Sequence, residues 1–173
     1  MQVVAVVLSL VALLVSLTIG VRQVTLARHA NSTRVLVDLF KEHRDANLAE
    51  ARRFVYFDLA GYDITAAGLD ALPRDRHKQV RDLLWFYDNL GLLVYHDIVS
   101  FEPVRGYLGG SMLTVWSKLE PLVAAERAKR ASSPDPSRWA WYCEELVTRL
   151  RAANADQFRP ARRRWYTRWL EPF

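Results

Sequence analysis

Residues Val3–Val21 read VVAVVLSLVALLVSLTIGV and contain no charged side chain. Their polar side chains are those of Ser9, Ser16 and Thr18. A helix of this length extends about 28 Å, close to the ~30 Å hydrocarbon core of a bilayer. A helix also satisfies its own backbone hydrogen bonds in hydrocarbon. The stretch therefore predicts a transmembrane anchor over residues 1–22, followed by a globular domain.

Two alternatives compete with this interpretation. A cleaved signal peptide has a basic n-region and a shorter apolar core, whereas only Met1 and Gln2 precede this run. A buried core helix is the second alternative, but a helix that is apolar on every side is unusual in a soluble domain of this size. We therefore expect an uncleaved anchor.

Basic residues flank the predicted span on its C-terminal side only, at Arg22, Arg28 and Arg34. The positive-inside rule then places the C-terminal domain in the cytoplasm and the N-terminus outside. The expected location is the plasma or inner cell membrane, crossed once. Cys143 is the single cysteine, so no intrachain disulfide can form, which agrees with a reducing compartment.

The net charge of +5 comes mostly from residues 159–173, which we call the Arg/aromatic tail. Its sequence, RPARRRWYTRWLEPF, holds five arginines and one glutamate, so the rest of the chain is nearly neutral. A nearly neutral body argues against a broad nucleic-acid-binding surface. Nucleic acid is accordingly not an expected partner.

Arginines interleaved with aromatic rings, as in this tail, suit contact with an anionic leaflet, a protein partner or nucleic acid. A terminal helix packed on its own domain is the structural alternative. Because the anchor holds the tail near the bilayer, we expect contact with the membrane surface first, then with a partner. The residues expected to make this contact are Arg162, Arg163, Arg164, Trp165, Tyr166, Arg168 and Trp169.

Helical periodicity dominates residues 31–158, which predict an all-helical cytoplasmic domain after a juxtamembrane segment at 23–30. The fold class expected is all-α, with the single transmembrane helix followed by a compact bundle of about five or six helices. Gly91, Gly109 and Gly110 are expected to end helices, and Pro121 to kink one. Residues 62–72 are predicted to be a loop, 92–98 a buried connection or short helix, and 136 the start of the last helix.

The most apolar predicted helix runs from Pro73 to residue 90. Its buried face is expected to consist of Val80, Leu83, Leu84, Tyr87 and Leu90. Trp85 and Phe86 make its second half apolar on nearly every side, which is typical of a central core helix.

Sequence motifs for catalysis are absent. The chain has no phosphate-binding loop, dinucleotide fingerprint or nucleophile elbow. Its histidines, at positions 29, 43, 77 and 96, lie in separate predicted segments without the spacing of metal ligands. Cys143 lies on an apolar helix face and is interpreted as a small buried hydrophobe. No catalytic residue, metal or cofactor is predicted.

Asp88 and Glu120 are acidic residues with apolar sequence neighbours. A buried carboxylate needs a partner, and Arg81, Arg105 or Arg127 are candidates. The functional alternative is a helix-lined pocket around Asp88 and Glu120. The structural interpretation is a satisfied ion pair or a solvent-facing strip, which we favour.

Four motifs carry a family resemblance: FYDNLGLLV (86–94), YLGG (107–110), W-x-x-L-x-P (116–121) and the Glu126-Arg127 pair. With the apolar N-terminal run, they resemble a bacterial family of small proteins of unknown function. The resemblance implies one N-terminal membrane helix and an all-helical cytoplasmic domain. It implies no catalytic residue, and it does not extend to the Arg/aromatic tail.

The anchor, the tail and the lack of a catalytic pattern favour a membrane-tethered interaction module, an adaptor or accessory subunit. Its expected partners are the lipid bilayer and either another protein or a second copy of the chain. The alternative is a membrane-anchored enzyme or effector with the pocket around Asp88 and Glu120.

Overall fold

The computed structural model describes the backbone of residues 2–157 and the side-chain surroundings of residues 13–23 and 32–155. Throughout this part the regular elements are helical, which confirms the all-α prediction for these residues. The α-helices are α1 (Gln2–His43), α2 (Ala46–Phe57), α3 (Ile64–Ala67), α4 (Arg74–Tyr95), α5 (Phe101–Lys129) and α6 (Trp141–Gln157). Short 3₁₀ helices occupy Leu59–Gly61, Gly68–Ala71 and Pro136–Arg138.

The chain divides into two compact units, residues 1–42 and 43–173. The first unit consists of α1 up to Glu42, and the helix continues unbroken through the predicted juxtamembrane segment at 23–30. Large apolar side chains on this helix are each more than half exposed: Leu13, Leu14, Val15, Leu17, Ile19 and Val21.

Within the described residues, no helix combines the length and the apolar character needed to cross a bilayer. The predicted transmembrane helix is therefore not supported by the structure. Residues 3–12 of the predicted span belong to the backbone of α1, but their side chains lie outside the described set.

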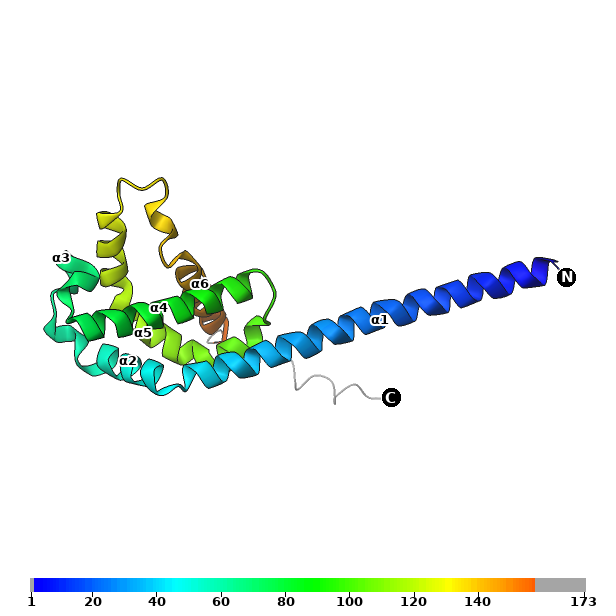
Figure 1. Ribbon diagram of the computed structural model, residues 1–173, viewed down its shortest axis with the longest axis horizontal. Helices are drawn as coiled ribbons and strands as arrows, with labels where there is room; N and C mark the ends of the chain where they lie inside the picture. Colours follow the sequence, from blue (N-terminus) through cyan, green and yellow to red (C-terminus); the bar gives the residue numbers. More distant parts are fainter. Residues whose placement is uncertain (1, 158–173) are drawn as a thin grey trace, which may run out of the picture. The chain divides into compact units, whose positions relative to one another are not determined.

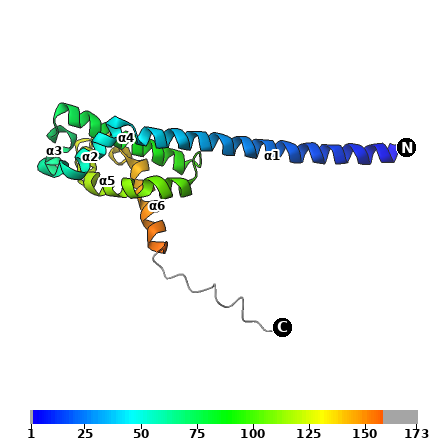
Figure 2. The ribbon, with the colours of Figure 1, turned by 90° about the horizontal axis from the view of Figure 1, so that it is seen from below.

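The second unit is a helical bundle in which α4 packs against both α2 and α6, as Figures 1 and 2 show. α5 packs against α2, α3 and α6 and completes the core. The predicted buried face of α4 is confirmed, because Val80, Leu83, Leu84, Tyr87 and Leu90 are all buried. Trp85 is instead 56% exposed, so the prediction that this helix is apolar and buried on nearly every side is wrong at that position.

Glycines that were expected to end helices lie inside them. α4 continues through Gly91 to Tyr95 and includes much of the predicted 92–98 connection, while α5 continues through Gly109 and Gly110. Two of these glycines allow close packing: a Cβ on Gly91 would overlap the Tyr142 carbonyl, and one on Gly109 would lie 3.1 Å from Leu150 Cδ2. The packing offsets the ~1 kcal/mol that glycine costs in a helix.

Two other predicted boundaries are also wrong. Residues 62–72 contain α3 and a 3₁₀ helix instead of an open loop. Pro136 begins a 3₁₀ turn, and α6 starts only at Trp141. α5 includes Pro121, and in Figure 1 its yellow second half points away from its green first half, as a bend at this proline would produce.

Candidate functional site

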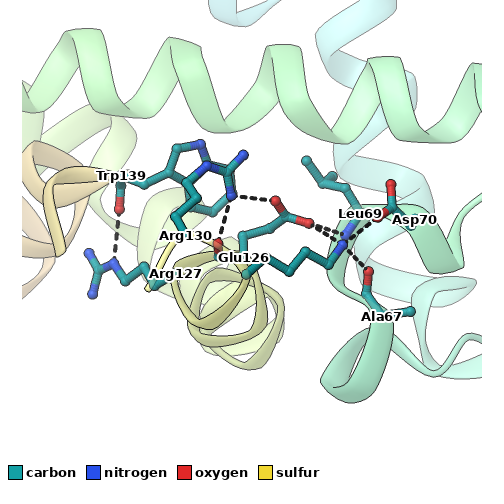
Figure 3. A network of polar contacts seen from close by, with 8 residues as sticks. Ala67, Leu69, Asp70, Glu126, Arg127, Arg130 and Trp139 are labelled. Atoms are coloured by element: carbon teal, nitrogen blue, oxygen red, sulfur yellow. Dashed lines mark hydrogen bonds and ion pairs between the residues drawn. The ribbon is translucent and has the colours of Figure 1, made fainter. Parts of the chain in front are cut away.

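A buried carboxylate organises the turn that follows α3. Glu126, on α5, is 4% exposed and accepts hydrogen bonds from the Leu69 backbone N–H at 2.9 Å, Lys129 Nζ at 2.9 Å and Arg130 Nη1 at 2.5 Å (Figure 3). Lys129 Nζ also donates to Asp70 Oδ2 at 2.5 Å. We call Glu126, Lys129, Arg130 and Asp70 the Glu126 network. It joins the last turn of α5 to the 3₁₀ helix at 68–71.

The Glu126 network is ionised at neutral pH. Burial by itself raises the pKa of Glu126, but hydrogen bonds from Arg130, Lys129 and the Leu69 amide together outweigh it and leave the pKa lowered. The hydrogen bond to Asp70 raises the pKa of Lys129. The Glu126 carboxylate and the Lys129 ammonium group therefore both stay charged, and most of the acceptor positions of Glu126 are already occupied.

Trp139 is fixed against α5 by two arginines. The Arg130 guanidinium lies 5.0 Å from the centre of its indole, and Arg127 Nε donates to its carbonyl oxygen at 3.0 Å (Figure 3). Arg127 Nη2 also pairs with Glu144 of α6 at 2.8 Å. These contacts hold the indole beside the Glu126 network.

A cavity of about 510 Å³ opens beside the Glu126 network. Cationic, acidic and apolar side chains all line it. The cations are Arg81, Lys129 and Arg130, the carboxylates Asp70 and Glu126, and the apolar residues Leu69, Trp85 and Trp139; the imidazole of His77 also lines it.

A second cavity, of about 730 Å³, shares His77 and Arg81 with the first. It adds Arg74, Asp75 and Lys78 from the beginning of α4. The two cavities together form what we call the α4–α5 basic groove. Arg74 and Lys78 make no ion pair with any residue in the described part of the chain, and Asp75, which lies beside them in this cavity, is instead 4.0 Å from Arg76.

Arg81 lies where the two cavities meet. Its guanidinium is 5.0 Å from the centre of the Trp85 ring, and its Nη2 lies 3.4 Å from Asp82 Oδ1. Its Nε is buried and finds no acceptor among the described residues. A buried donor without an acceptor costs free energy unless a ligand or water supplies one.

A separate polar cluster lies between α2, α4 and α5. Ser111 Oγ is 2.9 Å from the Tyr87 hydroxyl oxygen, 3.1 Å from that of Tyr56 and 3.3 Å from His43 Nε2. Burial raises the pKa of Tyr87, so the phenol stays protonated. Ser111 and His43 lie within hydrogen-bond distance of each other, but neither of the two cavities described above is lined by residues of this cluster. We therefore interpret the cluster as a satisfied polar network in the core.

His43 makes stability sensitive to acid. Burial, followed by the charges of Arg52 and Arg44, lowers its pKa from 6.5 to about 4, so the folded state favours the neutral ring. Its contribution to stability is complete above about pH 6.5 and is lost as the pH falls towards 4, because the unfolded chain then binds the extra proton. We expect the melting temperature of the wild type to fall more steeply over this range than that of His43→Gln. Parallel melting curves from pH 7 to 4 would contradict the assignment.

Asp88 and Glu120 do not share a site. Asp88 Oδ1 accepts a hydrogen bond from the Cys143 backbone N–H at 2.9 Å, whereas Glu120 is about half exposed and lies 3.6 Å from Arg151. Neither residue lines the cavities described here. Burial raises the pKa of Asp88 despite its hydrogen bonds to backbone amides. Glu120 forms an ion pair, as the structural interpretation expected, but with Arg151 and not with a candidate arginine. Asp88 is satisfied by a backbone amide, which was not predicted.

The hydrogen bond from Cys143 N–H shows that Asp88 caps α6. Ala140 precedes this helix with a positive φ of 57° and has no side-chain acceptor. Asp88 supplies the missing acceptor from α4, and Gly91 lets the two helices approach. The Cys143 thiol is 2% exposed, and burial raises its pKa, so the expected small buried hydrophobe is confirmed.

Other predicted site residues lie elsewhere. The tail residues Arg162, Arg163, Arg164, Trp165, Tyr166, Arg168 and Trp169 lie outside the described residues. In the part of the chain that the structure describes, no group of three or more His, Cys, Asp or Glu side chains is placed to hold a metal ion.

A family model for a domain of unknown function, DUF4760, matches residues 2–149. The chain belongs to the DUF4760 family. The match covers α1 through most of α6, and hence both the Glu126 network and the basic groove of this DUF4760 protein. The sequence-level resemblance to a family of unknown function is thereby confirmed. Neither a curated protein nor a solved structure matches the chain significantly.

Sequence reasoning missed the basic groove of this DUF4760 protein. Trp85 was predicted to belong to a central core helix, and Glu126 entered only through a family motif. One signal was available: Arg74, Lys78 and Arg81 recur at i, i+4 and i+7, which places three cations on one side of α4.

Proposed function

We propose that this DUF4760 protein is a membrane-tethered helical interaction module whose domain lies on the cytoplasmic side. The observation that carries the proposal is the exposed apolar surface of α1. Leu13, Leu14, Leu17 and Val21 are between 59% and 66% exposed. Large exposed apolar patches usually mark an interaction surface. Residues 3–21 carry no charged side chain, and a bilayer is the partner that suits such a sequence.

The orientation rests on the sequence flanks. Arg22, Arg28 and Arg34 follow the apolar run, and the positive-inside rule then favours a cytoplasmic bundle. The adaptor role rests on the second unit, where Asp88 and Glu126 are committed to structural contacts. Phe57, at 77% exposure, offers a large aromatic surface to a protein partner.

Membrane fractionation tests the tether. The full chain should stay in the membrane pellet after alkaline carbonate extraction, while the double variant Leu13→Arg/Leu17→Arg should shift to the supernatant, since each charge in hydrocarbon costs about 3 kcal/mol. Phe57→Arg is the control, because it also places an arginine at an exposed apolar residue, but in the second unit. A wild-type chain that is released by carbonate would overturn the tether.

Two further measurements test the orientation and the adaptor role. A C-terminal fluorescent protein should be active and a C-terminal alkaline phosphatase inactive in a Gram-negative host; the reverse pattern would contradict a cytoplasmic domain. Affinity purification from detergent-solubilised membranes at native abundance should recover a stoichiometric partner. Recovery of the chain alone, as a monomer, would contradict the adaptor role.

A further inference from the structure

The α4–α5 basic groove contains hydrogen-bond donors without acceptors, and most of its acceptors are already occupied. Both carboxylate oxygens of Glu126 already accept hydrogen bonds, and Asp70 Oδ2 is bound by Lys129. By contrast, the buried Nε of Arg81 has no acceptor among the described residues. A ligand that fits this groove must therefore bring acceptors.

The groove also favours a negative charge. Five cationic side chains with fixed charge line its two cavities, namely Arg74, Lys78, Arg81, Lys129 and Arg130, against the carboxylates Asp70, Asp75 and Glu126. Lys129 and Arg130 are neutralised inside the Glu126 network. Arg81 is partly compensated by Asp82 at 3.4 Å, so the unpaired charge left for a ligand is on Arg74 and Lys78, while the Nε of Arg81 remains without an acceptor among the described residues. Such a set, with the planar donor fork of an arginine at its centre, suits a phosphate group.

Aromatic surface adjoins these donors. Arg81 lies over one face of the Trp85 indole, which is still 56% exposed, and Arg130 lies over the Trp139 indole. An indole with one face on a guanidinium can stack a second flat ring on its other face. The first cavity, at about 510 Å³, is within the ordinary range for a small-molecule site.

We propose that the α4–α5 basic groove binds a nucleotide. Arg81 donates to the phosphates, Arg74 and Lys78 supply charge on the side of the second cavity, and the base stacks on Trp85. The proposal does not depend on the membrane tether, because every residue that it uses lies in the second unit.

Isothermal titration calorimetry of the full chain in detergent micelles tests this assignment, with ADP as the probe. ADP should bind with micromolar affinity, inorganic pyrophosphate about tenfold more weakly, and adenosine without measurable heat. No binding of ADP up to about 1 mM would overturn the proposal. Equal affinity for ADP and pyrophosphate would overturn the stacking of a base.

Two variants separate the contributions of phosphate and base. Arg81→Gln should weaken both ADP and pyrophosphate by about tenfold, since it removes a charge-assisted donor. Trp85→Leu should weaken ADP by about tenfold and leave pyrophosphate unchanged. Lys118→Gln is the control, because this exposed cation lies on α5 away from both cavities. If Arg81→Gln fails to fold, Arg81→Lys replaces it. This variant keeps the charge and should still bind ADP and pyrophosphate more weakly than the wild type. Variants that bind like the wild type would overturn the site.

A phosphate in this groove could also come from a lipid headgroup. The soluble headgroup inositol 1,4-bisphosphate is therefore titrated in parallel, and Trp85→Leu is measured with it. The proposal expects weaker binding than with ADP. If the headgroup binds more tightly than ADP, and if its affinity is the same for Trp85→Leu as for the wild type, the site recognises lipid phosphate and the nucleotide assignment is wrong.

Discussion

Replacing Gly91 by alanine should destabilise the second unit by about 3 kcal/mol, although the same change inside a helix normally stabilises by up to about 1 kcal/mol. The added Cβ would overlap the backbone carbonyl of Tyr142, which cannot move without displacing α6. Displacement of α6 would also lengthen the hydrogen bond between Asp88 and the Cys143 amide and leave a partly buried carboxylate without its partner.

Thermal unfolding of the full chain in detergent, followed by circular dichroism, measures this effect. The expected loss corresponds to a melting temperature about 6–12 °C lower. Gly106→Ala is the matched control, because Gly106 also lies inside a helix but has no atom within 4 Å of an added Cβ. That variant should melt at or above the wild-type temperature. If both variants are equally stable, α4 and α6 are not in close contact at Gly91.

Replacing Gly68 by alanine should cost about 3 kcal/mol as well, through two separate effects. Gly68 has φ +57° and ψ −133°, a conformation that other residues adopt only at a cost of about 1–3 kcal/mol. An added Cβ would also lie 2.5 Å from Glu126 Oε1 and push the carboxylate away from the Leu69 amide. The substitution therefore disrupts the Glu126 network as well as straining the turn.

The control for Gly68 is Gly61→Ala, since Gly61 lies in a neighbouring 3₁₀ helix with open space around it. It should change the melting temperature by less than about 2 °C, whereas Gly68→Ala should lower it by about 6–12 °C. A second readout is the pH dependence. Because Glu126 has a lowered pKa in the folded state, its contribution to stability is present at neutral pH and lost in acid. The difference in melting temperature between Gly68→Ala and the wild type should therefore shrink as the pH falls through the pKa of the folded carboxyl. A difference that is constant with pH would mean that only backbone strain is involved.

Local sequence signals predicted much of the bundle correctly. The start of α2 depends on neighbouring residues alone, because the Asp45 side chain accepts a hydrogen bond from the Asn47 amide and caps the helix. The buried face of α4 followed from the spacing of its apolar residues, each of which can lie on one side of a helix. These features depend only on residues that are close in sequence.

Several of the errors involve contacts between residues that are distant in sequence. Gly91 and Gly109 look like helix ends locally, but α6 packs against them and requires their lack of a side chain. Glu126 is buried because the Leu69 amide, 57 positions away, donates to it. Trp85 looks like a core residue, yet it is exposed beside Arg81, in a cavity that is also lined by residues 69–70, by residues of α5 and by Trp139. A single sequence does not reveal such pairs.

The capping of α6 by Asp88 also has a consequence for the order of folding. Ala140 offers α6 no side-chain acceptor, and the helix takes one from Asp88, 55 positions before Cys143. A helix of its length is marginal in water on its own, since nucleation of the first turn is unfavourable. We therefore expect α6 to become stable only when it docks on α4, so that its formation is coupled to tertiary structure.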